Sequence, residues 1–438
     1  MFKTYHNILV TGVTHEGQGI AHINDRVCFI QGALLGERLD IQVIKKKKGS
    51  WFAVVTNVLS SSPKRIEPQC EVYDVCGGCG LQHMSTETQI DIKQQALIQQ
   101  MQHQLGYIPE QVDDAIQLSP WAYRRKARLS VRYVAKKDSV LIGFRERSTH
   151  WVVNTKQCHI LSKQVNQCLQ RLAIILHGFS TRTVIAQVEL AVADNVTCLV
   201  LRHLEALMAI EQEQLKAFAR TEGIWLMTQS KKPYDLVKLW PEDHQYYLSY
   251  QLTTQGLTFD FHPADFIQVN GPVNQACVDK MLSWCALDGT ERVLDLFCGL
   301  GNFTLPLAQQ ARWVDGYELS EEMVVRASSN AKKNNVSNVD FFATDLSAIQ
   351  TGQWLMGHHY DLVVLDPPRC GAKEVVESIK SHIRPRRIVY ISCHWPTMVR
   401  DCDLLADHYT VVKLVTMDMF PQTYHIEVMA LLELRTND

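Results

Sequence analysis

The sequence predicts an α/β protein built in three successive parts. Its 438 residues suffice for two or three domains, and 46% apolar residues allow each to bury a core. Near the N-terminus, apolar and polar residues alternate between glycines, which is typical of short β-strands. Later, apolar runs alternate with helix-length segments, which indicates a doubly wound parallel sheet. We therefore expect a small β-barrel over residues 1–60, an α+β central domain over 61–260 and a Rossmann-like doubly wound domain over 261–438.

Composition and charge exclude several classes of protein. The formal net charge of −2 gives no general attraction to nucleic acid. The sequence has no run of about 18 apolar residues, the length that a membrane span requires. The N-terminal M-F-K-T-Y-H-N lacks the apolar core of a secretion signal, so we expect a cytoplasmic protein. In that compartment the 13 cysteines are expected to be reduced thiols, some of them ligating or catalytic.

The first 60 residues continue the strand pattern through V-C-F-I-Q-G and R-L-D-I-Q-V-I, as a small barrel requires. A Ser/Pro-rich linker follows over residues 60–68. Two basic runs, Lys45–Lys48 and Arg124–Arg132, could attract RNA locally. The second run alternates with apolar residues, like a strand with one basic face. A solvated surface explains either run equally well.

The middle of the chain mixes strand and helix patterns. Alternating and apolar runs predict strands, and helical periodicity predicts helices. The expected strands are Ala127–Val134, Val184–Ala193 and Thr197–Arg202, and the expected helices are Gln89–Leu105, Lys163–Leu176 and Glu211–Thr221.

Four cysteines have a spacing suited to a tetrathiolate centre. Cys70, Cys76 and Cys79 are separated by five and two residues, and Cys158 stands far downstream in K-Q-C-H. Adjacent glycines let the backbone fold tightly around such a centre. Thiolate sulfur selects zinc or an iron–sulfur cluster, and the spacing leaves both open. Because four ligands leave no open iron position, a cluster here is expected to be structural.

Acidic residues end successive strands of the C-terminal part. Asp295 precedes a glycine turn, and Glu318 ends the next strand, where it can accept from two ribose hydroxyls. Asp345 ends a third strand, placed for an adenine amino group, and Asp366 ends a fourth. The third glycine of a dinucleotide fingerprint is absent, since Thr304 follows the turn. The set therefore fits S-adenosylmethionine better than a dinucleotide, although each acid alone could be a helix cap.

Cys393 follows the apolar strand I-V-Y-I-S, so we expect it at the carboxyl edge of the sheet, where such folds bind ligands. A lone cysteine is more often a buried filler. A thiolate that adds to carbon-6 of uracil, however, makes carbon-5 nucleophilic enough to take a sulfonium methyl group. A base must then remove the carbon-5 proton. Glu427, in F-P-Q-T-Y-H-I-E, is the candidate base, and a surface acid is the alternative.

The motifs D-P-P-R-C-G, I-V-Y-I-S-C and D-M-F-P-Q-T-Y-H-I-E resemble those of the RNA 5-methyluridine methyltransferases. The family's F-x-Q-x-N motif stands at Phe266, Gln268 and Asn270, and D-L-F-C-G-L-G-N-F-T resembles its cofactor turn. The N-terminal barrel resembles a TRAM domain, an OB-like RNA-binding module. The cysteine spacing resembles the [4Fe-4S] site of the branch that methylates 23S ribosomal RNA. The resemblance covers nearly the whole chain.

This resemblance implies S-adenosyl-L-methionine and a [4Fe-4S] cluster as cofactors and 23S ribosomal RNA as partner. It implies neither a membrane nor an obligate protein partner. Cys393 would be the nucleophile and Glu427 the base. The cofactor and uracil pocket would be lined by Gln268, Phe297, Asn302, Glu318, Asp345 and Asp366, and the cluster would be held by Cys70, Cys76, Cys79 and Cys158.

The sequence departs from the family pattern directly after the nucleophile. The family usually has S-C-N-P, whereas here His394 follows Cys393 and the proline is Pro396. This difference affects the expected shape of the loop but removes neither catalytic group. His394 is a rival candidate for the base, because histidine has a reference pKa near 6.5.

Other classes of protein explain parts of the sequence. A structural zinc protein would account for the cysteines but not for the acids at strand ends. A radical S-adenosylmethionine enzyme usually has C-x3-C-x2-C and an open iron. A non-enzymatic RNA-binding protein would make the pairing of Cys393 with Glu427 accidental. Within the methyltransferases, a tRNA uridine-5-methyltransferase or another 23S ribosomal RNA site remains the alternative.

Overall fold

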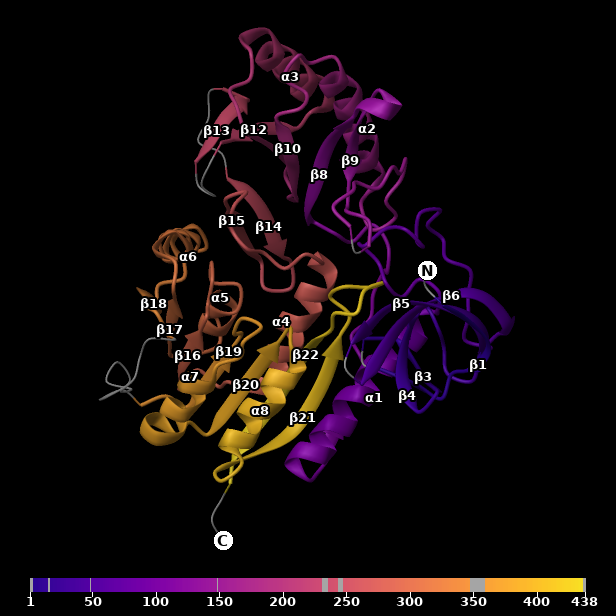
Figure 1. The fold of residues 1–438 in the computed structure, drawn as a ribbon. Helices are drawn as coiled ribbons and strands as arrows, with labels where there is room; N and C mark the ends of the chain where they lie inside the picture. Colours follow the sequence, from indigo (N-terminus) through magenta and orange to yellow (C-terminus); the bar gives the residue numbers. More distant parts are fainter. Residues whose placement is uncertain are drawn as a thin grey trace.

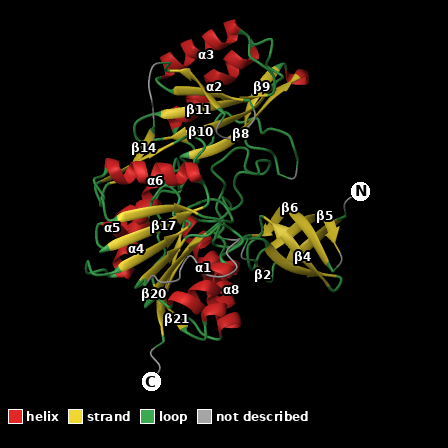
Figure 2. Ribbon diagram, turned by 90° about the vertical axis from the view of Figure 1, so that its left-hand side faces the viewer, coloured by secondary structure: helices red, strands yellow, loops and turns green. Residues whose placement is uncertain are grey.

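The computed structural model describes residues 3–14, 16–47, 49–147, 149–230, 235–242, 247–346 and 359–435. The described chain contains a small N-terminal sheet, a central sheet with a neighbouring hairpin, and a large C-terminal sheet. The N-terminal sheet stands to one side of the large sheet, and the central sheet lies beyond one end of it (Figure 1, Figure 2).

The N-terminal sheet has six strands in the order β1-β5-β6-β4-β3-β2. Alternate residues of β5, including Leu39, Ile41 and Val43, are buried in its core, so the period-two pattern does form strands here. The strands curl around this core (Figure 2). Their bounds are β1 Thr4–Leu9, β2 Gly12–Val13, β3 Gly19–Ile23, β4 Arg26–Gln31, β5 Arg38–Lys47 and β6 Ser50–Ser60.

The first basic run lies at the end of β5. The side chains of Lys45–Lys47 are exposed, and Lys48 lies outside the described residues. The Lys46 amine lies 4.5 Å from the centre of the Trp51 ring, and the Lys47 amine lies 5.6 Å from that of Phe52. Amines beside aromatic rings are a combination that suits single-stranded nucleic acid.

The central sheet has the strand order β13-β12-β11-β10-β8-β9, and α2 and α3 pack against it through one core. The strands and helices expected between residues 127 and 221 all form, with bounds shifted by a few residues. The elements are β8 Lys126–Val134, a 3-10 helix Ala135–Lys137, β9 Ser139–Gly143, α2 Lys163–His177, β10 Ile185–Val192, β11 Thr197–His203, α3 Ala209–Glu222, β12 Trp225–Gln229 and β13 Leu236–Trp240.

A separate hairpin links the central part to the C-terminal sheet. Its strands β14 (Leu248–Leu252) and β15 (Leu257–Phe261) pair antiparallel. Helix α4 (Gly271–Cys285) follows, and the Asn270 side chain caps it by accepting a hydrogen bond from the Val273 N–H at 3.4 Å. The cap fixes the helix start at the end of F-x-Q-x-N.

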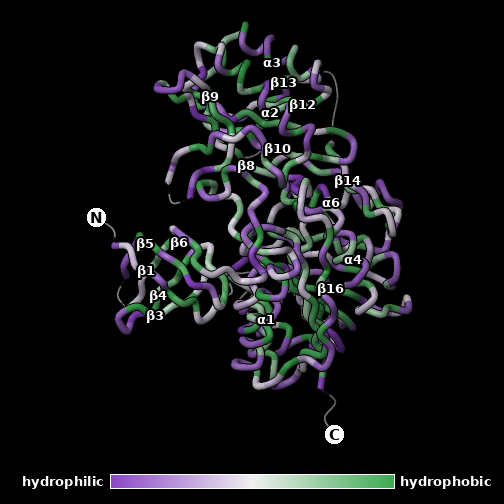
Figure 3. The backbone as a smooth tube through the Cα atoms, turned by 90° about the vertical axis from the view of Figure 1, so that its right-hand side faces the viewer, coloured by the Kyte–Doolittle hydropathy of each residue, from purple (hydrophilic) through white to green (hydrophobic). Residues whose placement is uncertain are grey.

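The large sheet has the order β18-β17-β16-β19-β20-β22-β21-β7. Its first five strands are parallel, as expected, and β22 joins β20 antiparallel. Hydrophobic segments are concentrated around β16 (Figure 3). The elements are β16 Arg292–Leu296, α5 Thr304–Ala308, β17 Trp313–Glu318, α6 Glu321–Lys333, β18 Val339–Ala343, β19 Leu362–Leu365, α7 Lys373–Ser378, a π-helix Ile379–Ile383, β20 Arg387–Ser392, α8 Trp395–Leu405, β21 Tyr409–Met417 and β22 Glu427–Leu434.

Helices cover both faces of this sheet. Buried residues of α4, α5 and α6 share a core with Val293 on one face, and residues of α7 and α8 share a core with Leu294 on the other. An earlier segment completes the second face: α1 (Thr86–Leu105) packs against α8, and β7 (Gln111–Val112) pairs with β21. Residues 61–260 therefore supply a helix and an edge strand to the C-terminal sheet.

Candidate active site

The carboxyl edge of the large sheet brings most of the candidate residues to one side of the molecule. Glu318 ends β17, Asp366 follows β19 and Cys393 follows β20. Glu427 begins β22, and because β22 runs antiparallel to β20, its first residue lies at this same edge. The register pairs Ser392 with Val428, which places Cys393 beside Glu427.

Burial is the largest cause of the pKa shifts of Glu427, Asp366 and Cys393. Burial, followed by the charge of Asp366, raises the pKa of Glu427 well above its usual value. Burial raises the pKa of Asp366 to about 7. Burial, then Glu427 and Asp366, raise the pKa of Cys393 to about 11, and the Arg369 guanidinium acts in the opposite direction. Two acids and a thiol thus share one poorly solvated site.

The glycine turn after β16 approaches Glu318 closely. The Gly299 N–H donates to Glu318 Oε2 at 3.1 Å. Phe297, Gly299 and Gly301 have φ values of +66°, +58° and +94°, in the left-handed region. This region favours glycine, so Phe297 is held in a conformation that a phenylalanine rarely adopts.

Asp295 lies fully buried beneath the turn. Its Oδ2 accepts a hydrogen bond from Thr304 Oγ1 at 2.6 Å, and its Oδ1 has no hydrogen-bond partner among the described residues. Burial raises its pKa to about 7. A buried acceptor without a partner suits a donor group from a ligand, so the turn fits a cofactor that carries an amine.

Asn302 is engaged with protein groups. Its Oδ1 accepts from Tyr250 Oη and from Asn274 Nδ2, each at 2.9 Å, and its Nδ2 donates to Asn274 Oδ1 at 3.0 Å. The expected cofactor residue therefore ties the turn to α4 and to the β14–β15 hairpin. Tyr250 and Asn274 were missed in the sequence because they lie far from the turn along the chain.

The two remaining candidates for the cofactor and uracil pocket, Asp345 and Gln268, are both less buried than Asp295. Asp345 is exposed after the edge strand β18, and residues 347–358 beyond it lie outside the described chain. Gln268 is half-buried in the loop before α4. Phe266 in the same loop is 68% exposed. An exposed aromatic ring of this kind is available for stacking on a base.

His394 stands between Cys393, the candidate nucleophile, and the first residue of α8. Its backbone N–H donates to Ser392 Oγ at 3.0 Å, and its Nδ1 lies 3.2 Å from Thr397 Oγ1. The histidine therefore replaces the family's asparagine at a helix start, with Trp395 and Pro396 in the first turn. The imidazole ring of His394 is thus engaged with a side chain of the first turn of α8.

A cavity of about 430 Å³ adjoins Cys393, the candidate nucleophile, and reaches residues 70–81, here called the cysteine segment. Two guanidinium groups, several aromatic rings and an imidazole line it, which suits an anionic chain with planar bases. The lining residues are Gly77, Gly78, Cys79, Gly80, Arg124, Phe144, Arg369, Cys393, Phe420, Thr423, Tyr424 and His425. Phe420 and His425 were not singled out in the sequence.

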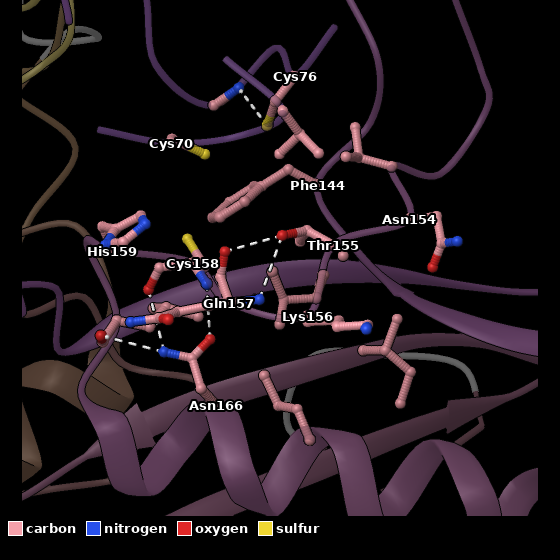
Figure 4. Close-up of a pocket in the computed structure, with 18 of the residues that line it drawn as sticks. Cys70, Cys76, Phe144, Asn154, Thr155, Lys156, Gln157, Cys158, His159 and Asn166 are labelled. Atoms are coloured by element: carbon pink, nitrogen blue, oxygen red, sulfur yellow. Dashed lines mark hydrogen bonds between the residues drawn. The ribbon is translucent and has the colours of Figure 1, made fainter. Parts of the chain in front are cut away.

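The four spaced cysteines line one cavity of about 330 Å³. Cys70 and Cys76 are seen on one side of the Phe144 side chain and Cys158 on the other (Figure 4). Burial, followed by neighbouring thiols, raises the pKa of Cys79 to about 11 and that of Cys158 to about 12. Among the described residues, no three Cys, His, Asp or Glu side chains are arranged to hold a metal ion.

Hydrogen bonds fix the backbone around this cavity. Arg147 donates to the carbonyl oxygens of Cys76 at 2.8 Å and Cys79 at 2.7 Å. Asn166 accepts from the Cys158 N–H at 2.7 Å and donates to its carbonyl oxygen at 3.0 Å. The four cysteines line the same cavity, and sulfur donors of this kind suit zinc or an iron–sulfur cluster.

The second basic run is partly neutralised. Arg125 forms an ion pair with Asp194 at 2.9 Å, and Arg128 forms one with Glu189 at 2.9 Å. Arg124 Nε donates to the Lys126 carbonyl at 3.0 Å. The run lies on and before β8, as the alternating pattern predicted, but carries less free positive charge than its sequence suggests.

Comparison with known proteins identifies the family. Residues 86–435 match the family described as tRNA (Uracil-5-)-methyltransferase. The chain belongs to this family. Residues 4–56 match the TRAM domain, so the N-terminal sheet is a TRAM domain. None of the described helices is long and apolar enough to cross a membrane.

Named relatives cover almost the full chain. The chain is 41% identical over 431 residues to a protein of Hahella chejuensis (strain KCTC 2396) named 23S rRNA (uracil(1939)-C(5))-methyltransferase RlmD, covering 97% of this chain and 96% of the relative. It is 39% identical to the protein of that name from Legionella pneumophila (strain Lens), with the same two coverages.

A solved structure shares the fold. It is that of Pyrococcus abyssi tRNA (uracil-54, C5)-methyltransferase with S-adenosyl-L-homocysteine. The TM-score is 0.72 at 21% identity, and the match covers 98% of this chain and 99% of the other.

The raised pKa of Cys393 predicts a pH-dependent reactivity. In the free protein the thiolate is scarce near neutral pH, so labelling of Cys393 by iodoacetamide should quicken about tenfold per pH unit between about pH 7 and pH 9. Arg369→Gln should slow labelling at each pH, because the guanidinium lowers this pKa. Peptide mass spectrometry measures both rates, with exposed Cys370 as internal reference. A plateau below about pH 8 would contradict the raised pKa.

Proposed function

We propose that this protein methylates carbon-5 of a specific uridine in 23S ribosomal RNA with S-adenosyl-L-methionine, through a covalent adduct between Cys393 and uracil carbon-6. The register of β20 and β22 carries the proposal, because it puts a thiol and a buried carboxyl side by side at the ligand-binding edge of the sheet. The reaction needs a nucleophile and a base that can both reach one bound uracil ring.

The cofactor would lie across the strand ends. Glu318 would accept from the ribose hydroxyls, Asp295 would accept from the amine through its unpartnered oxygen, and Phe297 would line the turn. Asp345 would face the adenine amino group, and Asn302 would hold the turn in shape. When bound, the cofactor supplies an electrophilic methyl group on a sulfonium.

Cys393 would attack carbon-6 of the uracil as the thiolate. Phe266 would stack on the flipped base, and Gln268 and Asp366 would bond its polar edge. A protonated Asp366 can donate to a uracil oxygen, and burial keeps part of its population protonated near pH 7. Cys393 would thus act on carbon-6, Phe266 on the face of the ring, and Gln268 and Asp366 on its polar edge.

Glu427 would remove the carbon-5 proton after methyl transfer, so that the thiolate can leave. Its raised pKa favours proton uptake once the carboxyl is ionised. His394 is a weaker candidate, because its ring nitrogen is engaged with Thr397 at the start of α8. The base and nucleophile would therefore come from neighbouring antiparallel strands.

The choice of ribosomal RNA as the substrate rests on the named relatives. The TRAM domain and the cavity beside Cys393 support it. Relatives at 39–41% identity over 97% of the chain are named as methyltransferases of uracil 1939 in 23S rRNA, and we propose the same target for this protein. The TRAM domain and the basic cavity beside Cys393 would bind the RNA around the target. We place the protein in the cytoplasm on the basis of this substrate. We assign RNA binding to residues 1–60, the cysteine site to 61–260 and methyl transfer to 261–438.

The substrate assignment predicts selective labelling. Purified protein with methyl-labelled S-adenosylmethionine should methylate a 23S ribosomal RNA fragment that contains the target uridine and leave tRNA unlabelled. The same fragment with cytidine at that position should not react. Nuclease digestion and mass spectrometry locate the product. Labelling of tRNA in preference to the fragment would favour the alternative substrate.

The catalytic pair predicts two different defects. Cys393→Ala should form no adduct with RNA, because the nucleophile is lost. Glu427→Gln should form the methylated adduct and release it about 10²–10⁴-fold more slowly, because general-base catalysis of proton removal is lost. A denaturing gel would show the adduct as a slow band. His394→Ala should turn over normally. An adduct trapped by His394→Ala and not by Glu427→Gln would reverse the assignment of the base.

We also propose that Cys70, Cys76, Cys79 and Cys158 hold a structural [4Fe-4S] cluster, since all four cysteines line one cavity. Protein purified without oxygen should contain iron and sulfide and absorb broadly in the blue. Cys158→Ser should lose most of the iron, whereas Cys370→Ser, at an exposed cysteine outside this site, should retain it. Stoichiometric zinc without sulfide would establish the zinc alternative.

A further inference from the structure

A short segment connects β21 to the candidate base at the start of β22. It spans residues 418–426, and groups outside the sheet anchor it. Asp418 and Lys93 of α1 form a buried ion pair at 3.2 Å. The Pro421 carbonyl accepts a hydrogen bond from Tyr123 Oη at 3.0 Å. The position of the base therefore depends on contacts made by residues much earlier in the chain.

Gln89 of α1 binds this segment through Gln422. Gln89 is 1% exposed; its Oε1 accepts from the Gln422 N–H at 3.0 Å, and its Nε2 lies 3.0 Å from Gln422 Oε1. The same Nε2 lies 3.1 Å from the carbonyl oxygens of Leu81 and Met84. Gln422 has a φ of +69°, in the region that favours glycine. The Gln89 amide thus stabilises a backbone conformation that is otherwise unfavourable.

The cysteine segment supports Gln422 from the other side. The N–H groups of Gly80 and Leu81 donate to the Gln422 carbonyl at 2.8 and 3.1 Å. A Cβ on Gly80 would clash with the Tyr424 ring, so this close approach requires glycine. Gly80 directly follows Cys79. The segment before the base is therefore held between α1 and the cysteine segment.

We propose that Gln89 is a positioning residue for the catalytic base: it fixes Gln422 between α1 and the cysteine segment and so sets where Glu427 enters the site. The inference rests on the proposed function, in which Glu427 removes the carbon-5 proton. Cys393, in contrast, follows β20, and the pairing of this strand with β19 and β22 involves no residue of the 418–426 segment. Loosening Gln422 should therefore affect release of the adduct more than its formation.

The test follows two steps of a single turnover on a 23S ribosomal RNA fragment that contains the target uridine. Formation and release of the Cys393 adduct are measured on denaturing gels. Gln89→Ala should slow release about tenfold or more and leave formation near wild type, because errors of about 1 Å in placing a reacting group are costly. Gly80→Ala should slow the same step, since the added methyl group displaces Tyr424.

Two matched variants serve as controls. Gln95→Ala changes an exposed glutamine of the same helix, and Gly178→Ala adds a methyl group at the end of α2, where the space is ordinary. Both should leave formation and release unchanged. Melting temperatures verify that each variant is folded, and Gly80→Ala carries the test alone if Gln89→Ala does not fold.

The outcomes separate two kinds of failure. Unchanged release in folded Gln89→Ala, or equal slowing of formation and release, would overturn the positioning role. Glu427→Gln is measured in parallel. If that variant also fails to accumulate adduct, the proposed catalytic function is wrong; if it accumulates adduct and Gln89→Ala does not, the error lies in the positioning inference alone.

Discussion

The antiparallel pairing of β22 with β20 is the constraint on which the candidate site depends. A parallel strand in that place would bring its carboxyl end, and not its first residue, to the edge where ligands bind. The observed register pairs Ser392 with Val428, and a slip of one residue would turn Glu427 to the other face of the sheet. The buried core residues of both strands, such as the paired Ile391 and Met429, fix this register because both must face the same helical layer.

The same edge concentrates acids that burial makes unfavourable in their charged form. Asp295, Asp366 and Glu427 all have raised pKa values, chiefly through burial. Such groups persist where the surrounding structure is rigid, and here the sheet and two helical layers provide that rigidity. A cationic ligand entering this edge would stabilise the carboxylates, so the charge distribution itself favours a sulfonium over a neutral or anionic cofactor.

Local sequence patterns predicted the parts of this structure that depend on neighbours along the chain. Apolar runs gave the parallel strands, and their ends located Glu318, Asp366 and Cys393. Contacts between distant segments have no local pattern, so the pairing of β7 with β21 and the bonds from Tyr250 to Asn302 were missed. The ion pairs of Arg125 and Arg128 were missed for the same reason, since their acidic partners lie 69 and 61 residues further along the chain.

The segment before Glu427 shows why the three parts of the chain act as one. Tyr424 contacts Gly80 and lies 3.3 Å from Gln31 Nε2 of the TRAM domain, while Gln422 bonds both α1 and the cysteine segment. These contacts fix the TRAM domain, the cysteine segment and the chain that leads to Glu427 relative to each other. An RNA held by the first two would therefore meet the nucleophile at a set distance. Under the proposed function, selection of one uridine would then follow from the spacing of rigidly joined sites, in addition to any reading of bases within the pocket.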